Sequence, residues 1–350
     1  MIQVMLVANA SSSHTIRWAN AIVSKGFDVV LVTQHEVMNG LVDEVRVEKL
    51  PFKNKLGYFL NVFSLKNLYR KYEPDFVHAY FASGYGALLA NSSIDYYLSV
   101  WGSDVYLYPN QSLLNKVILK RSLRKASNIF STSYAMKKET NKYTSKCIHV
   151  IPFGVDVSRY YINKQEDNTV VIGIAKVLDD IYGIDVLIRA FERIYKSDEG
   201  QTNIRLHIAG DGPAKSKLEG LVHELGISSN VKFLGWISFE ELPRFYASLD
   251  IFCVPSYSES FGVVAVEAGA SYLPSVVSNV GGLPEVVVDG ETGFVSEPGD
   301  ITDFSEKLLK LVKSPNLRDS MGKKARLRVE NEYVWNENVE EMCGYYRGNE

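Results

Sequence analysis

The residues best suited to chemistry lie in the segment 255–270, PSYSESFGVVAVEAGA, in which Glu259 and Glu267 stand on either side of Gly262. The short apolar run directly before it, residues 251–254, is typical of a buried strand. Small and helix-forming residues follow the glycine, so a helix is expected to start there. A strand, a short loop and a helix start together predict an anion site at the tip of the helix.

The expected helix start offers both donors and acceptors to a ligand. The free backbone N–H groups of Ser260, Phe261 and Gly262 would bind a phosphate or a polyhydroxylated ring. Glu267 follows among valines and alanines, where a carboxylate is costly unless it accepts strong hydrogen bonds, and a ribose diol would supply two. Glu259, in the loop, would reach sugar hydroxyls. The alternative is a helix-capping Glu259 and a core Glu267 with ordinary partners.

This segment resembles the retaining GT-B glycosyltransferases of family 4, which carry two glutamates in E-x7-E spacing within S-x-x-E-S-F-G-x-x-x-x-E-A. The resemblance implies that Glu259 and the amides after it hold the donor sugar, and that Glu267 binds the nucleotide ribose. It also implies the α/β fold class GT-B, in which two Rossmann-like, doubly wound parallel-sheet domains face a central cleft.

The resemblance extends over most of the chain and implies its domain organisation. Residues 1–165 are expected to form an N-terminal acceptor-binding domain and residues 166–330 a C-terminal domain that binds the nucleotide sugar. Residues 331–350 are expected to form a helix that crosses back to the first domain. The polar segment 163–168 is the best candidate for the linker.

Composition limits the class of protein. The 350 residues suit two domains, and 46% hydrophobic with 23% charged residues is ordinary for a globular protein. The three cysteines, Cys147, Cys253 and Cys343, show no disulfide or metal spacing, which favours a reducing cytoplasm. The amino terminus reads as a strand rather than a signal peptide, and no apolar run is long enough to span a bilayer.

Charge is divided unevenly along the chain. Residues 1–160 hold 19 Lys and Arg against 11 Asp and Glu, whereas residues 161–350 hold 19 against 30. Basic residues alternate with apolar ones in segments 52–71 and 116–146, a pattern that suits the surface of an anionic membrane. Ordinary amphipathic helices with solvated lysines are the alternative. No nucleic-acid motif occurs, and nucleic acid is not an expected partner.

The front of the chain alternates strands and helices, as a parallel sheet requires. The loop after the first expected strand, NASSS, contains no glycine, so the G-x-G-x-x-G fingerprint of dinucleotide-binding proteins is absent and a dehydrogenase is disfavoured. In this loop the resemblance would place Ser11 near the donor phosphates. His14 beside it is a catalytic base or, alternatively, a structural residue at the helix end.

The turn Trp101–Asp104 follows the expected strand 95–100, and strand ends of this kind face the ligand crevice. Related enzymes often have a histidine near this turn, whereas a bacterial subset has W-G-S-D, as here. Asp104 is therefore a candidate for contact with sugar or acceptor hydroxyls. A turn-capping aspartate is equally compatible with the pattern.

The resemblance also implies two cations on the donor diphosphate. Lys176, directly after the expected strand 169–175, fits the first position, although an ordinary surface lysine is the alternative. At the second position, just before Tyr182 and Gly183, this chain has Ile181. A missing stabilising contact of a few kcal/mol would slow catalysis strongly.

Three further turns match the family. Residues 210–213, GDGP, include Gly210 in a turn that is common after strands, and Gly235 and Trp236 stand where the base of the donor packs in the family. Residues 281–285, GGLPE, repeat the family's G-G-x-P-E loop, whose role is open and includes a purely structural one.

The sequence thus predicts a cytoplasmic enzyme that moves a sugar from a nucleotide donor, UDP favoured, to an acceptor hydroxyl with retention, and that needs no cofactor or metal. Expected partners are the nucleotide sugar, a glycan or lipid-linked acceptor, and an anionic membrane surface. Two alternatives remain open. A nucleotide-sugar 2-epimerase would form product without an acceptor, and a catalytically weak homologue acting as a binding subunit would hold nucleotide without turnover.

Overall fold

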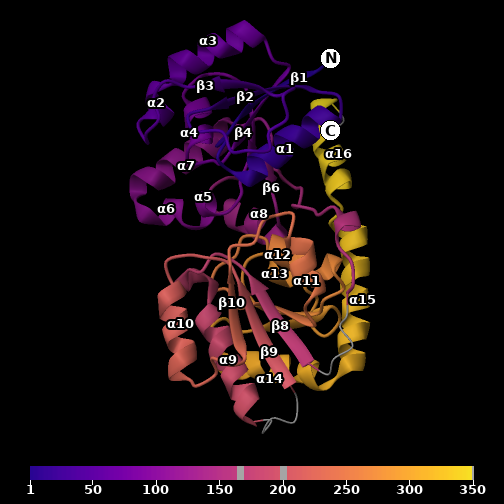
Figure 1. Cartoon of the computed structure of the whole chain (residues 1–350). Coiled ribbons are helices and arrows are strands. Elements are labelled where there is room, and N and C mark those ends of the chain that lie inside the picture. The colour runs from indigo at the N-terminus through magenta and orange to yellow at the C-terminus, as the bar shows by residue number, and fades with distance from the viewer. Residues whose placement is uncertain (164–168, 198–202, 349–350) are drawn as a thin grey trace. The chain divides into compact units, whose positions relative to one another are not determined.

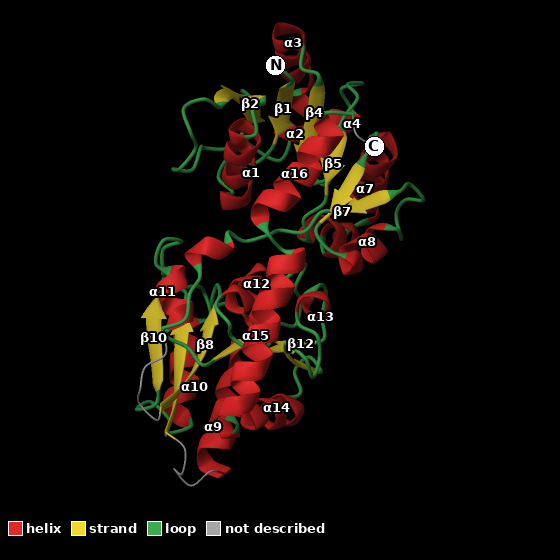
Figure 2. Cartoon of the chain, turned by 90° about the vertical axis from the view of Figure 1, so that its right-hand side faces the viewer, coloured by secondary structure: helices red, strands yellow, loops and turns green. Residues whose placement is uncertain are grey.

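The structure is a computed structural model that describes residues 1–163, 169–197 and 203–348. The chain divides into two compact units, unit 1 (Met1–Pro152 with Asn336–Glu350) and unit 2 (Phe153–Trp335) (Figures 1 and 2). The boundaries therefore fall after Pro152 and Trp335, where the sequence suggested 165 and 330. Apart from Asn163, the expected linker lies outside the described residues.

Unit 1 is built on a parallel sheet whose seven described strands have the order β3-β2-β1-β4-β5-β6-β7. The strands are β1 Gln3–Val7, β2 Asp28–Thr33, β3 Arg46–Lys49, β4 Phe76–Tyr80, β5 Tyr97–Ser99, β6 Ile129–Ser131 and β7 Ile148–Val150. The helices are α1 Ser13–Ser24, α2 Gly57–Leu60, α3 Val62–Tyr72, α4 Tyr85–Ala90, α5 Ser103–Tyr106, α6 Tyr108–Gln111, α7 Leu113–Lys125, α8 Tyr134–Thr140 and α16 Trp335–Tyr346.

The two faces of this sheet are buried by helices from different parts of the chain. Alternate residues of a strand point to opposite faces. Val77 of β4 packs in a core that includes Leu88 of α4 and Leu119 of α7. Its neighbour His78 is also fully buried, and its ring nitrogens lie 2.5 Å from the Tyr346 hydroxyl of α16 and 2.9 Å from Ser99 Oγ. The last helix is thereby joined to the first sheet.

Unit 2 has a parallel sheet whose six described strands have the order β10-β9-β8-β11-β12-β13. The strands are β8 Thr169–Ala175, β9 Asn203–Ala209, β10 Val231–Gly235, β11 Ile251–Val254, β12 Ser275–Ser278 and β13 Gly293–Ser296. The helices are α9 Ile184–Ser197, α10 Lys215–Glu224, α11 Leu242–Ala247, α12 Val263–Ala270, α13 Leu283–Val286, α14 Ile301–Lys313 and α15 Pro315–Glu332, with 3-10 turns at Val157–Arg159 and Asp180–Tyr182.

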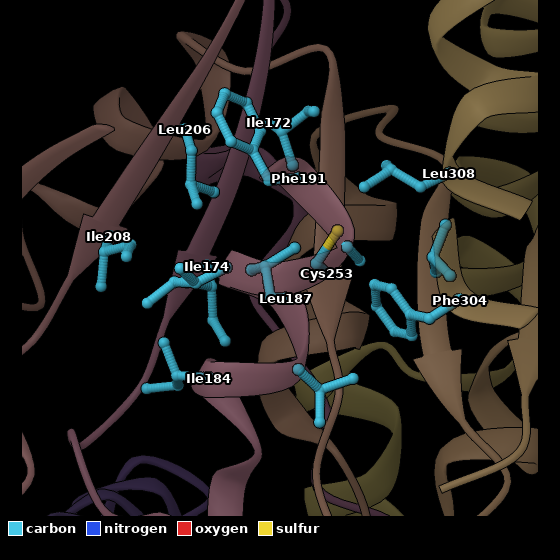
Figure 3. Packing of buried hydrophobic residues seen from close by; sticks show 14 of the residues in the cluster. Ile172, Ile174, Ile184, Leu187, Phe191, Leu206, Ile208, Cys253, Phe304 and Leu308 are labelled. Carbon is cyan, nitrogen blue, oxygen red and sulfur yellow. The ribbon is translucent and has the colours of Figure 1, made fainter. Parts of the chain in front are cut away.

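A closely packed apolar core holds one face of this sheet against α9, α10 and α14. Figure 3 shows side chains from strands and helices meeting there, among them Ile172, Ile174, Leu206, Ile208 and Cys253 from the strands, and Leu187, Phe191, Phe304 and Leu308 from the helices. Because all strands are parallel, the loops that leave their carboxyl ends emerge at one edge of the sheet. This edge is where a ligand site is expected.

Two parallel sheets with helices on both faces confirm the expected α/β architecture. The expected strands 169–175 and 251–254 and the expected helix 263–270 have those bounds in the structure. Within the described residues, no helix has the length and apolarity that crossing a bilayer would require.

Burial lowers the pKa of His78 from its ordinary 6.5 to about 3. Between these pH values the unfolded chain binds a proton at this site that folded unit 1 does not, so stability is lost as the pH falls below 6.5, by up to about 1.4 kcal/mol per pH unit. We therefore expect wild-type unit 1 to lose about 2 kcal/mol more than His78→Gln between pH 6.5 and 5. Urea-dependent hydrogen exchange of the β4 amides measures this difference, with His223→Gln, at an exposed position, as the control. Equal losses in all three proteins would contradict the assignment.

Candidate active site

A pocket opens at the carboxyl edge of the unit 2 sheet, beside the ends of β8 and β9 and against α11 and α12. Its lining residues are Ala175, Lys176, Val177, Ala209, Gly210, Asp211, Trp236, Ile237, Leu242, Tyr246, Val264 and Glu267. Four residues that the sequence singled out are among them, Lys176, Gly210, Trp236 and Glu267. Among these described lining residues, Lys176 is the only cation.

Lys176 forms an ion pair with Glu259. Lys176 Nζ lies 2.6 Å from Glu259 Oε2, and the two side chains are only 15% and 11% exposed. The same ammonium sits 4.5 Å from the centre of the Tyr182 ring, which is a cation–π contact. Lys176 is therefore held in a defined place at the pocket wall, and the alternative of an ordinary surface lysine is wrong.

Glu267 also lines the pocket, and it is buried and hydrogen-bonded there. The Tyr246 hydroxyl donates to Glu267 Oε2 at 2.8 Å. Burial first, and then the negative charge of Glu267, raise the pKa of Tyr246 well above its ordinary value, so the phenol keeps the proton that it donates. The buried carboxylate thus has a partner and still faces the pocket, where a diol would find it.

Helix α12 starts where the sequence indicated. Gly262 is its N-cap residue, with a φ of +102°. The Phe261 side chain is buried and packs edge-on against Tyr333, with ring centres 5.7 Å apart. The Phe261 side chain therefore belongs to the core of unit 2, and any contact of this residue with a ligand would have to be made by its backbone. Ser260 beside it is half-buried.

Two glycines allow the backbone approaches that place the ion pair. A Cβ on Gly210 would lie 1.8 Å from the carbonyl oxygen of Lys176, and a Cβ on Gly281 would lie 1.5 Å from the carbonyl oxygen of Glu259. Both glycines also have positive φ angles that other residues rarely adopt. The GGLPE loop therefore supports the loop that carries Glu259, which is a structural role.

The expected base-binding residues lie at the end of β10. The Gly210 N–H donates to the Gly235 carbonyl at 2.7 Å, which joins the two turns. Trp236 follows and is 75% exposed, so its ring presents a large flat surface beside the pocket. A nucleobase stacks readily on such a surface.

The two predicted site residues of unit 1 have other surroundings. Asp104 is fully buried, and its carboxylate accepts backbone hydrogen bonds from Ala82, Trp101 and Gly102 at 2.9–3.2 Å. Burial raises the pKa of Asp104, and these hydrogen bonds oppose the rise. Asp104 thus shapes its turn, the alternative stated above, and in this structure its carboxylate is not exposed to a ligand. Ser11 is exposed, and its hydroxyl donates to Asn9 Oδ1 at 2.6 Å.

Sequence reasoning missed two aromatic residues of the site. Tyr246 lies 21 residues before Glu267, and no local pattern links the two. Tyr182 directly follows Ile181, which stands where the resemblance implies a second cation. That neighbouring position was the one feature of the sequence that could have drawn attention to Tyr182. In the described part of the chain, no cluster of three or more His, Cys, Asp or Glu side chains is arranged to hold a metal ion.

Two family models match the chain. The model "Glycosyl transferases group 1" matches residues 160–328, and the model "Glycosyl transferase 4-like" matches residues 3–133. The matched segments lie in the two halves of the chain and together include every residue of the pocket.

Relatives and a solved structure agree with these models. An uncharacterized glycosyltransferase of Methanocaldococcus jannaschii is 29% identical over 276 residues, which are 77% of this chain and 75% of that protein. MMP alpha-(1->4)-mannosyltransferase of Mycolicibacterium hassiacum is 32% identical over 219 residues, which are 62% of this chain but only 50% of that protein. Anabaena HepE, solved with UDP and glucose, superposes with a TM-score of 0.81 over 99% of each chain at 19% identity, a likeness that shows the fold alone.

The close approach at Gly281 has a matched control in Gly290. Both have positive φ angles, +52° and +74°, but a Cβ on Gly290 would meet nothing within 4 Å. Each change to alanine should cost roughly 1 kcal/mol or more of stability through backbone strain. Only Gly281→Ala should also displace the Glu259 loop, which amide hydrogen exchange over residues 257–264 would show as faster exchange than in Gly290→Ala. The same exchange in both variants would contradict the supporting role of Gly281.

Proposed function

The chain belongs to the GT4-like glycosyltransferases of GT-B fold, and from this we propose that it transfers a sugar from a nucleoside-diphosphate sugar to an acceptor hydroxyl, with retention of configuration. The observation that carries the proposal is the pocket lined by both Lys176 and Glu267, together with the ion pair that ties Glu259 to Lys176. Glu259 itself is not among the lining residues. A cation, a buried carboxylate and a sugar-facing carboxylate are the groups that the diphosphate, ribose and sugar parts of such a donor require.

In the proposed reaction, Lys176 stabilises the negative charge that develops on the departing diphosphate. Glu259 and the backbone amides at the start of α12 orient the sugar. The bond between the sugar carbon C1 and the phosphate oxygen breaks, the acceptor oxygen bonds to C1 on the same face, and the acceptor proton passes to the departing phosphate oxygen. This route needs neither a separate protein base nor a metal ion, since Lys176 supplies the positive charge.

Nucleotide recognition is assigned to Glu267 and Trp236. The buried Glu267 carboxylate, fixed by Tyr246, accepts hydrogen bonds from the ribose hydroxyls. The exposed Trp236 ring offers a stacking surface to the base. We favour UDP as the nucleotide because Anabaena HepE, which has this fold, was solved with UDP and glucose.

One observation favours a second candidate, a binding subunit with weak turnover. Lys176 is the only cation among the described residues that line the pocket, and Glu259 already neutralises it. A thermal-shift panel of UDP, GDP and ADP sugars, followed by a transfer assay with the sugar that binds, separates the two candidates. The enzyme releases nucleotide in the presence of an acceptor, whereas the subunit binds the sugar nucleotide unchanged.

The two glutamates should differ in what their loss removes. Glu259→Ala is expected to lower transfer by at least about 100-fold without loss of nucleotide binding, because its carboxylate faces the sugar. Glu267→Ala is expected to weaken nucleotide binding about tenfold or more, because the ribose loses a charged hydrogen-bond acceptor. Transfer is measured as released nucleotide and binding by calorimetry, with Glu306→Ala on α14 as an exposed control. Full activity in both variants would reject the assignments.

We also propose that the enzyme works at the cytoplasmic face of the cell membrane, in glycan, polysaccharide or glycolipid biosynthesis. Unit 1 carries an apolar-basic face on α2, α3 and α7 and the loop before α2. Its large apolar side chains are mostly exposed, and they are Leu56, Phe59, Leu60, Phe63, Leu113, Leu114 and Val117. Helices α2 and α7 both contact the fully buried α4, and α3 contacts α2, so the helices that carry these residues lie near one another in unit 1 (Figure 1).

Charge complementarity supports a lipid partner for the apolar-basic face. Helices α3 and α7 contain no Asp or Glu. Five basic residues lie on α7, namely Lys116, Lys120, Arg121, Arg124 and Lys125. An ordinary amphipathic helix would bury its leucines, yet Leu113 is 84% exposed. Apolar side chains among exposed cations match a bilayer with anionic headgroups. A lipid-linked acceptor would be presented at the same surface.

Vesicle flotation tests this part of the proposal. Wild-type protein should float with vesicles of phosphatidylglycerol and phosphatidylcholine but not with phosphatidylcholine alone. The double variant Phe63→Ser/Leu113→Ser should bind more than about tenfold more weakly, since such side chains contribute roughly 1.5–3 kcal/mol each on burial. Leu327→Ser, at a 57% exposed position on α15 of unit 2, is the matched control and should float like the wild type. Absence of wild-type protein from the anionic vesicles would refute the membrane contact.

A further inference from the structure

The ion pair between Lys176 and Glu259 ties together two groups that the proposed reaction assigns to different parts of the donor. Their 2.6 Å contact is mostly shielded from water, with side chains 15% and 11% exposed. Screening by solvent and salt is weak in such a place, so the attraction is much stronger than between surface charges. In the ligand-free protein the positive charge of Lys176 is therefore already occupied by Glu259.

The remaining charges of the pocket do not replace that positive charge. Asp211 and Glu267 also line it, and Lys215, 3.3 Å from Asp211, is engaged with that carboxylate. With Lys176 paired to Glu259, the described lining is net negative. A nucleoside diphosphate that enters this pocket meets like charge unless Glu259 moves away from Lys176.

Resting on the function proposed above, we propose that Glu259 competes with the nucleotide diphosphate for Lys176 and so makes the site prefer the sugar nucleotide over the free nucleotide product. Glu259 is then a specificity-determining residue with two partners. The sugar hydroxyls are its partner when the donor is bound, and Lys176 is its partner when the sugar is gone.

The two ligands differ in the way this competition requires. A sugar nucleotide brings hydroxyls that donate hydrogen bonds to Glu259, so that Lys176 is released to the diphosphate and neither side chain is left without a partner. The free nucleoside diphosphate brings no such hydroxyls, and its terminal phosphate carries roughly 1.5–2 negative charges near pH 7. Binding it would leave the largely buried Glu259 carboxylate without a partner, which is costly.

The same competition assists turnover. Once the sugar has been transferred, Glu259 loses its hydroxyl partners and returns to Lys176, which weakens the hold on the departing nucleotide. Tyr182 helps to hold the ammonium in this place in both states, because its ring centre lies 4.5 Å from Lys176 Nζ. A ligand shifts such an equilibrium only through its different contacts with the two states, and here those contacts are the sugar hydroxyls.

Glu259→Gln tests the competition, because it removes the charge and keeps the shape of the side chain. Calorimetric titration with UDP, and in parallel with GDP and ADP, is expected to show about tenfold tighter binding of the nucleotide by Glu259→Gln than by the wild type. Uridine, which lacks phosphates, should bind both proteins equally. In a Lys176→Met background, Glu259→Gln should have no effect on nucleotide binding, since the contested cation is absent. Glu306→Gln on α14 controls for the loss of a negative charge elsewhere in unit 2.

The outcomes separate this inference from the function on which it rests. If the wild type binds one of the three nucleotides and Glu259→Gln binds it equally or more weakly, the proposed competition is overturned. The transferase proposal then still stands. Failure of all three nucleotides to bind either protein would overturn both. If Glu259→Gln does not fold, judged by its circular dichroism and melting curve, Glu259→Asp takes its place. The shorter carboxylate reaches Lys176 less well, and nucleotide binding should again be tighter than in the wild type.

Discussion

The contact between Lys176 and Glu259 is the interaction on which the site depends. It joins residues 83 positions apart in the chain and holds a carboxylate against the one cation among the described residues that line the pocket. Both partners must be held in place, because displacing either one leaves the other charge shielded from water and without a partner. The parallel sheet supplies the framework, since the loops after β8 and β11 leave the same edge. Gly210 and Gly281 let neighbouring backbone lie against those loops.

A second constraint concerns the buried carboxylate. Helix α12 is apolar almost all round and buried on most sides, which is unusual for a helix that also carries a glutamate. Glu267 is tolerated there because the Tyr246 phenol donates to it and because the carboxylate reaches the pocket. Glu267 is thus hydrogen-bonded within the core and also presents a hydrogen-bond acceptor to the pocket. Together with Lys176, it gives the pocket one end suited to phosphate and another suited to hydroxyl groups.

Charge is distributed in keeping with these roles. Residues 161–350, which include the pocket, hold an excess of acids. Under the proposed function, the anionic donor would therefore be bound by local features, namely Lys176 and the amides of α12. Part of the basic excess of residues 1–160 lies on α3 and α7 of unit 1, which also expose phenylalanine and leucine. Nucleotide binding and membrane contact would therefore be served by different units, each with the charge that its own ligand requires.

The sequence by itself determined the α/β class, the GT-B fold and four of the residues that line the pocket, Lys176, Gly210, Trp236 and Glu267. The seven-residue strand 169–175 is strongly patterned, and the four-residue strand 251–254 is wholly apolar and directly precedes the glutamate motif. Glu259, Glu267 and Lys176 stand in positions that marked them. It did not indicate β3, β6, β7, β12 or β13, because strands of three or four residues carry too little periodicity.

Tertiary structure alone decided what each marked residue touches. It paired Lys176 with Glu259, gave Glu267 a partner in Tyr246, and buried Asp104 among backbone amides where the sequence left a ligand contact equally open. These outcomes depend on which loops the parallel sheet brings to one edge. Contacts between residues far apart in the chain arise from packing, and they cannot be predicted from local sequence spacing.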